Sequence, residues 1–314
     1  MSRPLISICI PAYKKVQFLE RLLTSIAQQT FHDYEVIVTD DSPDLSVQEL
    51  CNNFKSQFIL IYFKNEPSLG SPENWNEGIR KANGVWIKMM HDDDWFQNKY
   101  ALQKFAEKAK KQSTSTFIFS AFTEIDLTSL HHQSFITNRL VLKWLRKSPL
   151  ILFRKNYIGH PSTTLIKNSL SYYYDKNLKW VVDIEFYIRY LQANPSFTVI
   201  HEPLINIGLH EQQITKEAFR NPEIEIPEVL YLANKLPDES FKHIAVYDYY
   251  WRFLRNLSIR SLDDIWKYAP GINVPDIITE MIQDQSSYPL KKLKIGLISK
   301  LLMLKSYFSN YKDL

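Results

Sequence analysis

The sequence predicts an α/β fold in which a mostly parallel, Rossmann-like sheet is flanked by helices and followed by a helical C-terminal extension. Short apolar runs typical of buried strands alternate with helix-spaced apolar residues over residues 5–90. Strand, helix, strand in this order builds a parallel sheet. Beyond residue 215 the strand-like runs stop and long amphipathic patterns take over, which indicates helices.

The first half of the chain contains four predicted strand–helix repeats. Pro11 ends the first strand, and residues 19–26 place aliphatic side chains at helical spacing. The carboxyl ends of the strands would bring residues 11–13, 40–41 and 92–94 to one edge of the sheet, where open parallel sheets bind ligands. The strands are expected at residues 5–10, 34–39, 58–63 and 85–90, and the helices at 18–29, 47–54 and 74–82.

The second half of the chain predicts a less regular continuation of the same domain. A helix, a strand and an irregular polar loop come first, and a further helix and a short strand follow. Long helices are then expected at about residues 240–258 and in the tail. The other expected bounds are 100–111 for the helix, 116–120 for the strand, 127–139 for the loop, 182–193 for the next helix and 198–201 for the short strand.

Composition restricts the class of protein. With 45% hydrophobic and 14% aromatic residues, the 314-residue chain is globular rather than disordered. We expect it to stay in the cytoplasm, because its N-terminus has no apolar stretch long enough for the core of a secretory signal. The whole chain has a net charge of +4, and residues 288–314 alone, with six lysines and one acidic residue, contribute +5 of it. The rest of the chain therefore has a net charge of −1. The body therefore offers no basic face for a nucleic acid polymer.

Three adjacent carboxylates, Asp92, Asp93 and Asp94, follow the last predicted strand of the first half. Such a cluster repels itself unless a cation binds there. Mg²⁺ and Mn²⁺ bind carboxylate oxygens and usually keep positions for substrate phosphates, so the cluster indicates metal-assisted phosphate chemistry. The alternative is a solvated acidic turn, which is the usual nature of a short charge run.

Four further segments carry specific motifs. They are residues 6–13 (ISICIPAY), 25–31 (SIAQQTF), 34–42 (YEVIVTDDS) and 76–84 (NEGIRKANG). Together with the acidic cluster they resemble the family 2 glycosyltransferases, which have the GT-A fold, and the resemblance covers roughly residues 4–215. It implies a nucleotide-diphospho-sugar donor, Mn²⁺ or Mg²⁺ as cofactor, and a glycan or lipid-linked acceptor.

The resemblance also assigns residues to the donor. Pro11 and Tyr13 would line the nucleoside pocket, Asp41 would accept a hydrogen bond from the base, Asp92 would lie nearer the ribose, and Asp93 would be the main metal ligand. Strand-end packing is the alternative for the tyrosine, and an Asx-type turn cap is the alternative for the Asp41 carboxylate.

Three positions depart from the pattern of the family. His91 stands at the first position of the Asp-x-Asp-Asp motif, which leaves open how many protein oxygens reach the metal. Lys14 stands where the family usually has asparagine, and Pro43 follows the first acidic pair. Asp94 is expected to play a structural part.

The catalytic base is expected in residues 180–186 (WVVDIEF), which match the segment that carries this carboxylate in the family. Asp183 is the first choice, because its apolar neighbours would raise its pKa and suit it to accept a proton. Glu185 is the second choice. A helix N-cap is the structural alternative for Asp183 and is compatible with the catalytic role.

Two histidines complete the predicted site. Residues 207–213 (IGLHEQQ) resemble the family's closing loop, so His210 is a tentative ligand of the metal or diphosphate. Residues 159–162 (GHPS) resemble the acceptor-side loop, where His160 would touch an acceptor sugar. A lone histidine is more often an ordinary surface or core residue, and that alternative stays open for both.

We therefore expect a metal-dependent, inverting glycosyltransferase that uses a UDP-sugar in surface polysaccharide biosynthesis, with retaining chemistry as an open alternative. Residues 1–125 would form the nucleotide-sugar-binding half of the GT-A domain, residues 126–215 the acceptor and catalytic half, and residues 216–314 the helical extension. A sugar-nucleotidyl transferase is one rival, although it should carry a glycine-rich phosphate loop and the first glycine here is Gly70. A catalytically silent, glycosyltransferase-like binding subunit is the other.

The tail has an apolar stripe with interspersed lysines, which is typical of a helix that lies on a membrane surface. Its apolar runs are far shorter than the roughly 20 residues that a membrane span needs. We expect peripheral attachment to the cytoplasmic membrane face. The alternative is that the stripe packs on the body of the enzyme or on a second copy of the chain. The stripe consists of Leu290, Leu293, Leu297, Leu301, Leu304 and Phe308.

Overall fold

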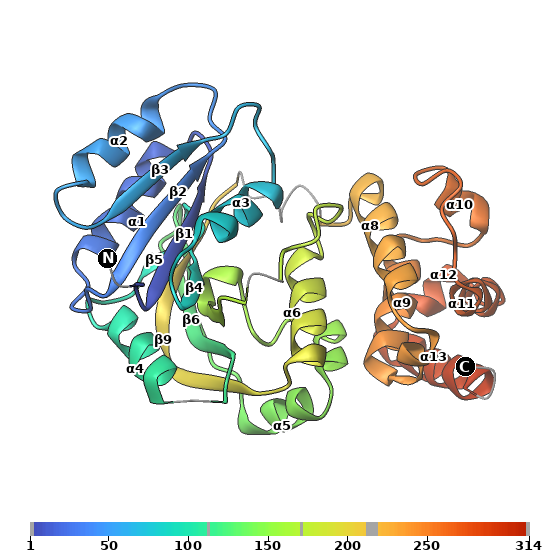
Figure 1. The fold of residues 1–314 in the computed structure, drawn as a ribbon. Coiled ribbons are helices and arrows are strands. Elements are labelled where there is room, and N and C mark those ends of the chain that lie inside the picture. Colours follow the sequence, from blue (N-terminus) through green and yellow to red (C-terminus); the bar gives the residue numbers. More distant parts are fainter. Residues whose placement is uncertain (1–2, 112–113, 170–171, 212–218, 312–314) are drawn as a thin grey trace. The chain divides into compact units, whose positions relative to one another are not determined.

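A computed structural model describes residues 3–111, 114–169, 172–211 and 219–311 (Figure 1). The chain forms two compact units. The first, called the sheet unit here, comprises Met1–Arg146, Tyr157–Lys176 and Arg189–Glu211. The second, called the helical unit, comprises Lys147–Asn156, Asn177–Ile188 and Gln212–Leu314.

The first four strands of the sheet unit are parallel and lie in the order β3-β2-β1-β4. The chain runs from β1 outward to β2 and β3, then returns to place β4 on the other side of β1. This reversal creates a topological switch point between β1 and β4, and open α/β sheets bind ligands at the carboxyl ends of the strands there. The bounds are Ile6–Ala12 for β1, Tyr34–Asp40 for β2, Leu60–Lys64 for β3 and Trp86–Met89 for β4.

The rest of the sheet is mixed. Strand β8 runs antiparallel to both β4 and β6, whereas β6 pairs in parallel with β9. Short strand β5 adds to β9, and β7 forms an antiparallel pair with β6. The bounds are Trp95–Phe96 for β5, Phe117–Asp126 for β6, His132–Phe135 for β7, Thr164–Lys167 for β8 and Phe197–Leu209 for β9.

Side-chain alternation along β1 assigns helices to the two faces of the sheet. Ile6, Ile8 and Ile10 are fully buried in one apolar cluster with residues from α1, α2 and α4. The side chain of Cys9 points to the opposite face, where α3 lies so close that a Cβ on Gly78 would be 3.3 Å from the Cys9 Cβ. The bounds are Val16–Ala27 for α1, Ser46–Phe54 for α2, Glu73–Lys81 for α3, Ala101–Lys111 for α4, Arg139–Lys147 for α5, Pro161–Thr163 for the 3₁₀ turn η2 and Val182–Ala193 for α6.

The helical unit has a core rich in aromatic rings. Tyr250 on α9 packs with its ring centroid 5.1 Å from that of Phe241 and 6.0 Å from that of Phe153. Within the described residues, no helix is both long enough and apolar enough to cross a membrane. The bounds are Pro149–Phe153 for the 3₁₀ turn η1, Pro222–Lys235 for α8, Asp238–Lys242 for η3, Ile244–Asn256 for α9, Leu262–Trp266 for α10, Asp276–Ser286 for α11, Leu290–Leu293 for α12 and Gly296–Asn310 for α13.

The predicted α/β fold with a helical C-terminal extension is confirmed, and two local expectations were wrong. The loop expected at 127–139 contains β7, a polar segment whose backbone is paired by β6. The short strand expected at 198–201 is part of the longer β9, in which a register shift against β6 absorbs the polar interruption before Pro203. Strands β5 and β8 were not expected. The predicted boundary after residue 215 lies outside the described residues.

Candidate functional site

The loops that follow β1 and β4 meet at the switch point of the sheet. The backbone N–H of Tyr13, just after β1, lies 3.5 Å from the Asp92 carboxylate, just after β4. Strand β9 ends beside them, so that His210 Nε2 is 3.0 Å from Asp93 Oδ2 and 3.5 Å from Lys15 Nζ. Residues from three distant parts of the sequence therefore form one polar site.

His91, Asp93 and Asp94 form a group that could hold a metal ion. Each offers a ligand atom, and these atoms lie within 4.8 Å of one another. The Nε2 atom of His91 is buried and has no hydrogen-bond partner among the described residues. A buried polar atom without a partner is costly, and a bound cation would satisfy it.

The carboxylates of the cluster are held in unequal states of charge. Burial, with the adjacent charge of Asp93, raises the pKa of Asp92 to about 8 and that of Asp94 to about 7. Burial also opposes the charge of Asp93, but the hydrogen bond from His210 helps to hold the Asp93 pKa below its ordinary value. The three groups do not all ionise readily at neutral pH, and a divalent cation among them would lower their pKa values.

The donor set fits the divalent cation that the sequence led us to expect. Carboxylate oxygens suit Mg²⁺ and Mn²⁺, and imidazole nitrogen is an accepted ligand of first-row transition metals. Burial lowers the pKa of His91 to about 4, which keeps its imidazole neutral as metal ligation requires. Asp94, expected to be structural, also accepts a hydrogen bond from the backbone of Gly208 at 3.3 Å.

The two residues of the acidic pair at the end of β2, Asp40 and Asp41, form different hydrogen bonds. Asp40 forms the Asx turn, because its carboxylate accepts the Ser42 N–H at 2.8 Å. Asp41 instead holds the loop before α3, accepting the N–H groups of Leu69 and Gly70 at 3.0 and 2.8 Å. The Asx-type alternative considered for Asp41 is thus filled by its neighbour, and contact of Asp41 with a base stays a prediction.

Two basic side chains that the sequence analysis missed, the buried Lys88 and the partly buried Arg21, support the acidic loop. The ammonium of Lys88 on β4 donates to the Ser162 carbonyl, and burial lowers the Lys88 pKa well below its ordinary value. Arg21 on α1 donates to the Asp93 carbonyl at 3.0 Å, and its guanidinium stacks 3.8 Å from the centre of the Trp95 ring. A lysine inside an otherwise apolar strand was the available signal for the first. Nothing in the local sequence indicated the second.

Ser162 and Gly208 fix the same loop from other elements. The Ser162 hydroxyl accepts the His91 N–H at 2.9 Å, which joins the turn η2 to the end of β4. Gly208 lies so close that a Cβ there would be 2.5 Å from the Asp93 carbonyl oxygen. Any larger residue at this position would displace the loop.

His160 also lies in the sheet unit. Its Nε2 is 3.8 Å from a Glu124 oxygen, and its ring meets the Phe122 ring edge-on at 5.6 Å. Gly159 before it has φ of +104°, and a Cβ there would be 2.7 Å from the Phe122 ring, so this position requires glycine. The imidazole is partly exposed, and its contact with an acceptor stays a prediction.

The two candidate bases belong to the first turn of α6, in the part that lies in the helical unit. Asp183 is partly exposed and accepts a hydrogen bond from the Asn156 amide at 2.8 Å. Glu185 is buried and forms an ion pair with Lys235 at 2.7 Å. Asp183 lies inside the helix, which begins at Val182, and is not its N-cap.

The sequence is similar to those of known glycosyltransferases. A family model described as glycosyl transferase family 2 matches residues 7–172. An uncharacterized glycosyltransferase of Haemophilus influenzae is 27% identical over 224 residues, which are 67% of this chain and 70% of that protein. The GalNAc(5)-diNAcBac-PP-undecaprenol beta-1,3-glucosyltransferase of Campylobacter jejuni is 31% identical over 93 residues, 29% of this chain and 30% of that protein.

Solved glycosyltransferase structures have a similar fold. TarS 1-349 of S. aureus in complex with UDP-GlcNAc matches with a TM-score of 0.64 at 16% identity, over 98% of this chain and 91% of that one. A longer TarS chain is matched over 52% of its length. The mannosyltransferase PcManGT of Pyrobaculum calidifontis, in complex with GDP-Man and Mn²⁺, matches with a TM-score of 0.56 at 13% identity, over 99% of this chain and 87% of that one.

We expect Asp93→Asn to weaken Mn²⁺ binding because it removes the carboxylate that keeps its charge most firmly. The loss should reach at least the roughly 10- to 100-fold that a supporting residue alone costs at a metal site. Titration of Mn²⁺ into the purified protein measures it. Glu20→Gln, which removes an exposed carboxylate on α1, is the control. Equal affinity of Asp93→Asn and the unaltered protein would show that the metal is held elsewhere.

Proposed function

The chain belongs to glycosyl transferase family 2, and from this membership we propose that it transfers a sugar from a UDP-sugar to a hydroxyl of a surface glycan or of its lipid-linked precursor. It is a transferase of the EC 2.4 class with a nucleotide-sugar donor. The observation that carries the finer proposal is the His91, Asp93 and Asp94 group at the switch point of the sheet.

The donor nucleotide binds over the carboxyl ends of β1 and β2 in this proposal. Tyr13 is 49% exposed just beyond β1, which makes its ring available to stack on a base, and Pro11 lies two residues before it in β1. Asp41 receives the base, and Asp92 lies toward the ribose. UDP is proposed as the nucleotide because TarS 1-349 forms a complex with UDP-GlcNAc, whereas the more distant PcManGT binds GDP-Man.

Asp93 is the principal residue to hold Mn²⁺ or Mg²⁺, with His91 and Asp94 as its neighbours in the group. When bound, the cation neutralises the diphosphate leaving group as a Lewis acid. His210 is proposed to reach the cation or the diphosphate, and its hydrogen bond to Asp93 supports that proposal. Arg21 and Ser162 position the loop that carries these ligands.

Asp183 is the proposed general base. The acceptor hydroxyl gives its proton to the Asp183 carboxylate while its oxygen attacks the anomeric carbon and the bond to the diphosphate breaks. A single displacement of this kind inverts the anomeric configuration. The Glu185 carboxylate is already bound by Lys235, which supports Asp183 as the proton acceptor.

Transfer activity can be tested directly with a panel of donors. We expect purified enzyme with Mn²⁺ and a glycan acceptor to release nucleotide fastest from a UDP-sugar, and to stop in EDTA. Faster release from a GDP- or dTDP-sugar would correct the base. A sugar-nucleotidyl transferase would form a nucleotide sugar from a sugar phosphate, and a silent subunit would bind nucleotide without releasing it, so either result would overturn the proposal.

The assignment of the base predicts opposite behaviour for two nearby carboxylates. Asp183→Asn should keep donor binding and lose transfer, because removal of a positioned base typically costs on the order of 10²- to 10⁴-fold in rate. Glu185→Gln should lower the thermal stability by breaking the ion pair with Lys235, while the folded fraction stays active. Rates and melting temperatures of both variants measure this. An inactive Glu185→Gln beside an active Asp183→Asn would move the base to Glu185.

The tail forms two helices, α12 and α13, and not the single helix with one apolar stripe that the sequence predicts. The helix breaks between Leu293, which is buried in α12, and Gly296, where α13 begins. Helix α13 packs on the helical unit through Met303 and Tyr307, so part of the tail does pack on the protein itself. Three apolar residues of α13 remain exposed, namely Leu297, Leu301 and Phe308. We propose that this exposed stripe attaches the enzyme peripherally to an anionic membrane surface, near a lipid-linked acceptor.

Replacing the exposed stripe should release the protein from membranes. We expect Leu297→Gln, Leu301→Gln and Phe308→Gln together to lower recovery with anionic vesicles in a flotation assay. The matched control is Leu45→Gln, Leu130→Gln and Ile136→Gln, which removes three exposed apolar side chains from the sheet unit. Equal recovery of the two triple variants would contradict the anchor. A concentration-dependent dimer lost only in the α13 variant would assign the stripe to a second copy.

A further inference from the structure

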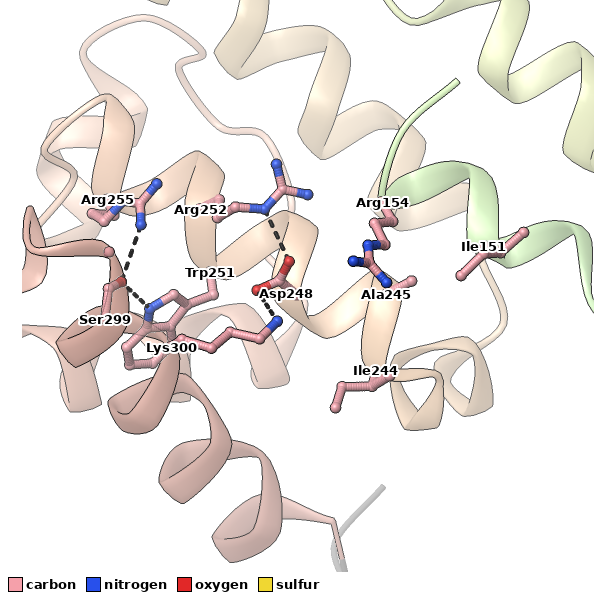
Figure 2. Close-up of a pocket in the computed structure, with 11 residues that line it drawn as sticks. Ile151, Arg154, Ile244, Ala245, Asp248, Trp251, Arg252, Arg255, Ser299 and Lys300 are labelled. Atoms are coloured by element: carbon pink, nitrogen blue, oxygen red, sulfur yellow. Dashed lines mark hydrogen bonds and ion pairs between the residues drawn. The ribbon is translucent and has the colours of Figure 1, made fainter. Parts of the chain in front are cut away.

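The helical unit contains a pocket of about 530 Å³ that the proposed reaction does not use (Figure 2). The end of η1, helix α9 and the first turn of α13 line it. Its volume is within the range of small-molecule sites in proteins, roughly 300–1,000 Å³. All of its lining residues belong to the helical unit.

The charge of the pocket is strongly positive. Its lining includes Arg154, Arg252, Arg255 and Lys300, and a single acidic residue, Asp248. The Asp248 carboxylate is already shared, because it lies 3.0 Å from Arg252 Nε and 3.0 Å from Lys300 Nζ (Figure 2). One carboxylate between two cations leaves a net positive field over the cavity.

Two guanidinium groups remain for a ligand. Arg154 is exposed, and within the described chain its guanidinium group forms neither a hydrogen bond nor an ion pair, whereas its backbone N–H donates to the Ile151 carbonyl. Arg255 donates to the Ser299 hydroxyl at 3.2 Å and to the Asn256 amide oxygen, both neutral groups. Burial and the neighbouring charge of Arg252 lower the Arg255 pKa, which indicates that its positive charge is not fully compensated.

Helix α13 adds its N-terminus to the same cavity. Gly296 and Ser299 of its first turn line the pocket. The helix has no acidic residue in that turn and no side chain that caps it. An uncapped N-terminus presents backbone N–H groups and a partial positive charge, and a Cβ on Gly296 would meet nothing within 4 Å, so a ligand can approach the backbone.

We propose that this pocket is a binding site for a phosphate group, which Arg255 and the first turn of α13 hold while Arg154 adds positive charge from the other end of the lining (Figure 2). Guanidinium groups bind phosphate oxygens in pairs of parallel hydrogen bonds, and a helix N-terminus favours the same anion. The cavity is larger than a phosphate alone and includes the apolar side chain of Ile244, so it leaves room for the group that the phosphate is attached to. The site goes beyond the proposed donor and base residues, none of which lines it.

The phosphate could come from a lipid headgroup or from a soluble phosphate ester. Exposed Leu297 and Leu301 are one residue away from Gly296 and Lys300 along α13, so a lipid phosphate could enter the pocket while its chains meet the exposed stripe. A soluble ester would need only the pocket. The two sources require different probes, inorganic pyrophosphate for the soluble one and phosphatidic acid vesicles for the lipid.

The test compares two charge-matched double variants of the full chain. Arg154→Gln with Arg255→Gln empties the pocket of its two available cations, and Lys242→Gln with Lys267→Gln removes two exposed lysines elsewhere in the helical unit. Pyrophosphate binding is measured by calorimetry in EDTA, where no divalent cation can recruit it to the acidic cluster. Recovery on phosphatidic acid vesicles, against neutral vesicles, is measured by flotation.

We expect the pocket variant to lose about tenfold or more in affinity for at least one probe, while the control behaves as the unaltered protein. Loss confined to vesicles identifies a lipid phosphate, and loss with both probes identifies a site that also accepts soluble esters. Arg154→Gln alone, at an exposed side chain, should show a smaller loss without affecting the melting temperature. Equal binding of the pocket and control variants to both probes would overturn the proposal, as would the absence of binding by the unaltered protein.

Discussion

The crowding of negative charge at the end of β4 is the constraint around which the sheet unit is organised. Three consecutive carboxylates lie there at the switch point between β1 and β4, with Asp94 buried and Asp92 and Asp93 partly buried. Burial alone would favour protonation of all three. A hydrogen bond from His210 and the nearby Lys15 ammonium favour the charged form of Asp93. The ligand atoms of the group are also spaced to receive a cation. The Asp93 charge is thus retained for binding, whereas Asp92 and Asp94 ionise less readily near neutral pH because their pKa values are raised.

The shape of that loop is maintained by residues with no chemistry of their own in the reaction. Arg21 lies between the Asp93 carbonyl and the Trp95 ring, and the buried Lys88 joins β4 to the η2 turn through Ser162. Gly208 allows β9 to approach the loop so closely that a Cβ there would be 2.5 Å from the Asp93 carbonyl oxygen. Each contact comes from a different element, so the loop is fixed from several directions. Fixed ligands reorganise little when substrate binds, which is the general advantage of a preorganised site.

Helix α13 contributes residues to the core of the helical unit, to the exposed apolar stripe and to the basic pocket. Met303 and Tyr307 pack into the helical unit, Leu297, Leu301 and Phe308 face outward, and the first turn borders the basic pocket. These faces follow from helical periodicity, which separates residues three and four apart from those between them. The basic side chains of the pocket come from the residue after η1, from α9 and from α13, which lie far apart in the sequence. A count of charges along the chain therefore does not reveal the pocket and assigns the basic character to the tail alone.

The sequence by itself determined the strand–helix repeats, the family and the place of the acidic cluster, because these depend on local periodicity and on contiguous motifs such as residues 91–94. It did not indicate Arg21, and it left Asp41 open between a turn and a base contact, because hydrogen-bond partners such as Leu69 and Gly70 are chosen by the folded chain. Tertiary structure alone decided that β9 continues through its polar interruption and that His210 meets Asp93 across 117 residues. Long-range pairing supplies the partners that make such local choices favourable, and no stretch of sequence contains that information on its own.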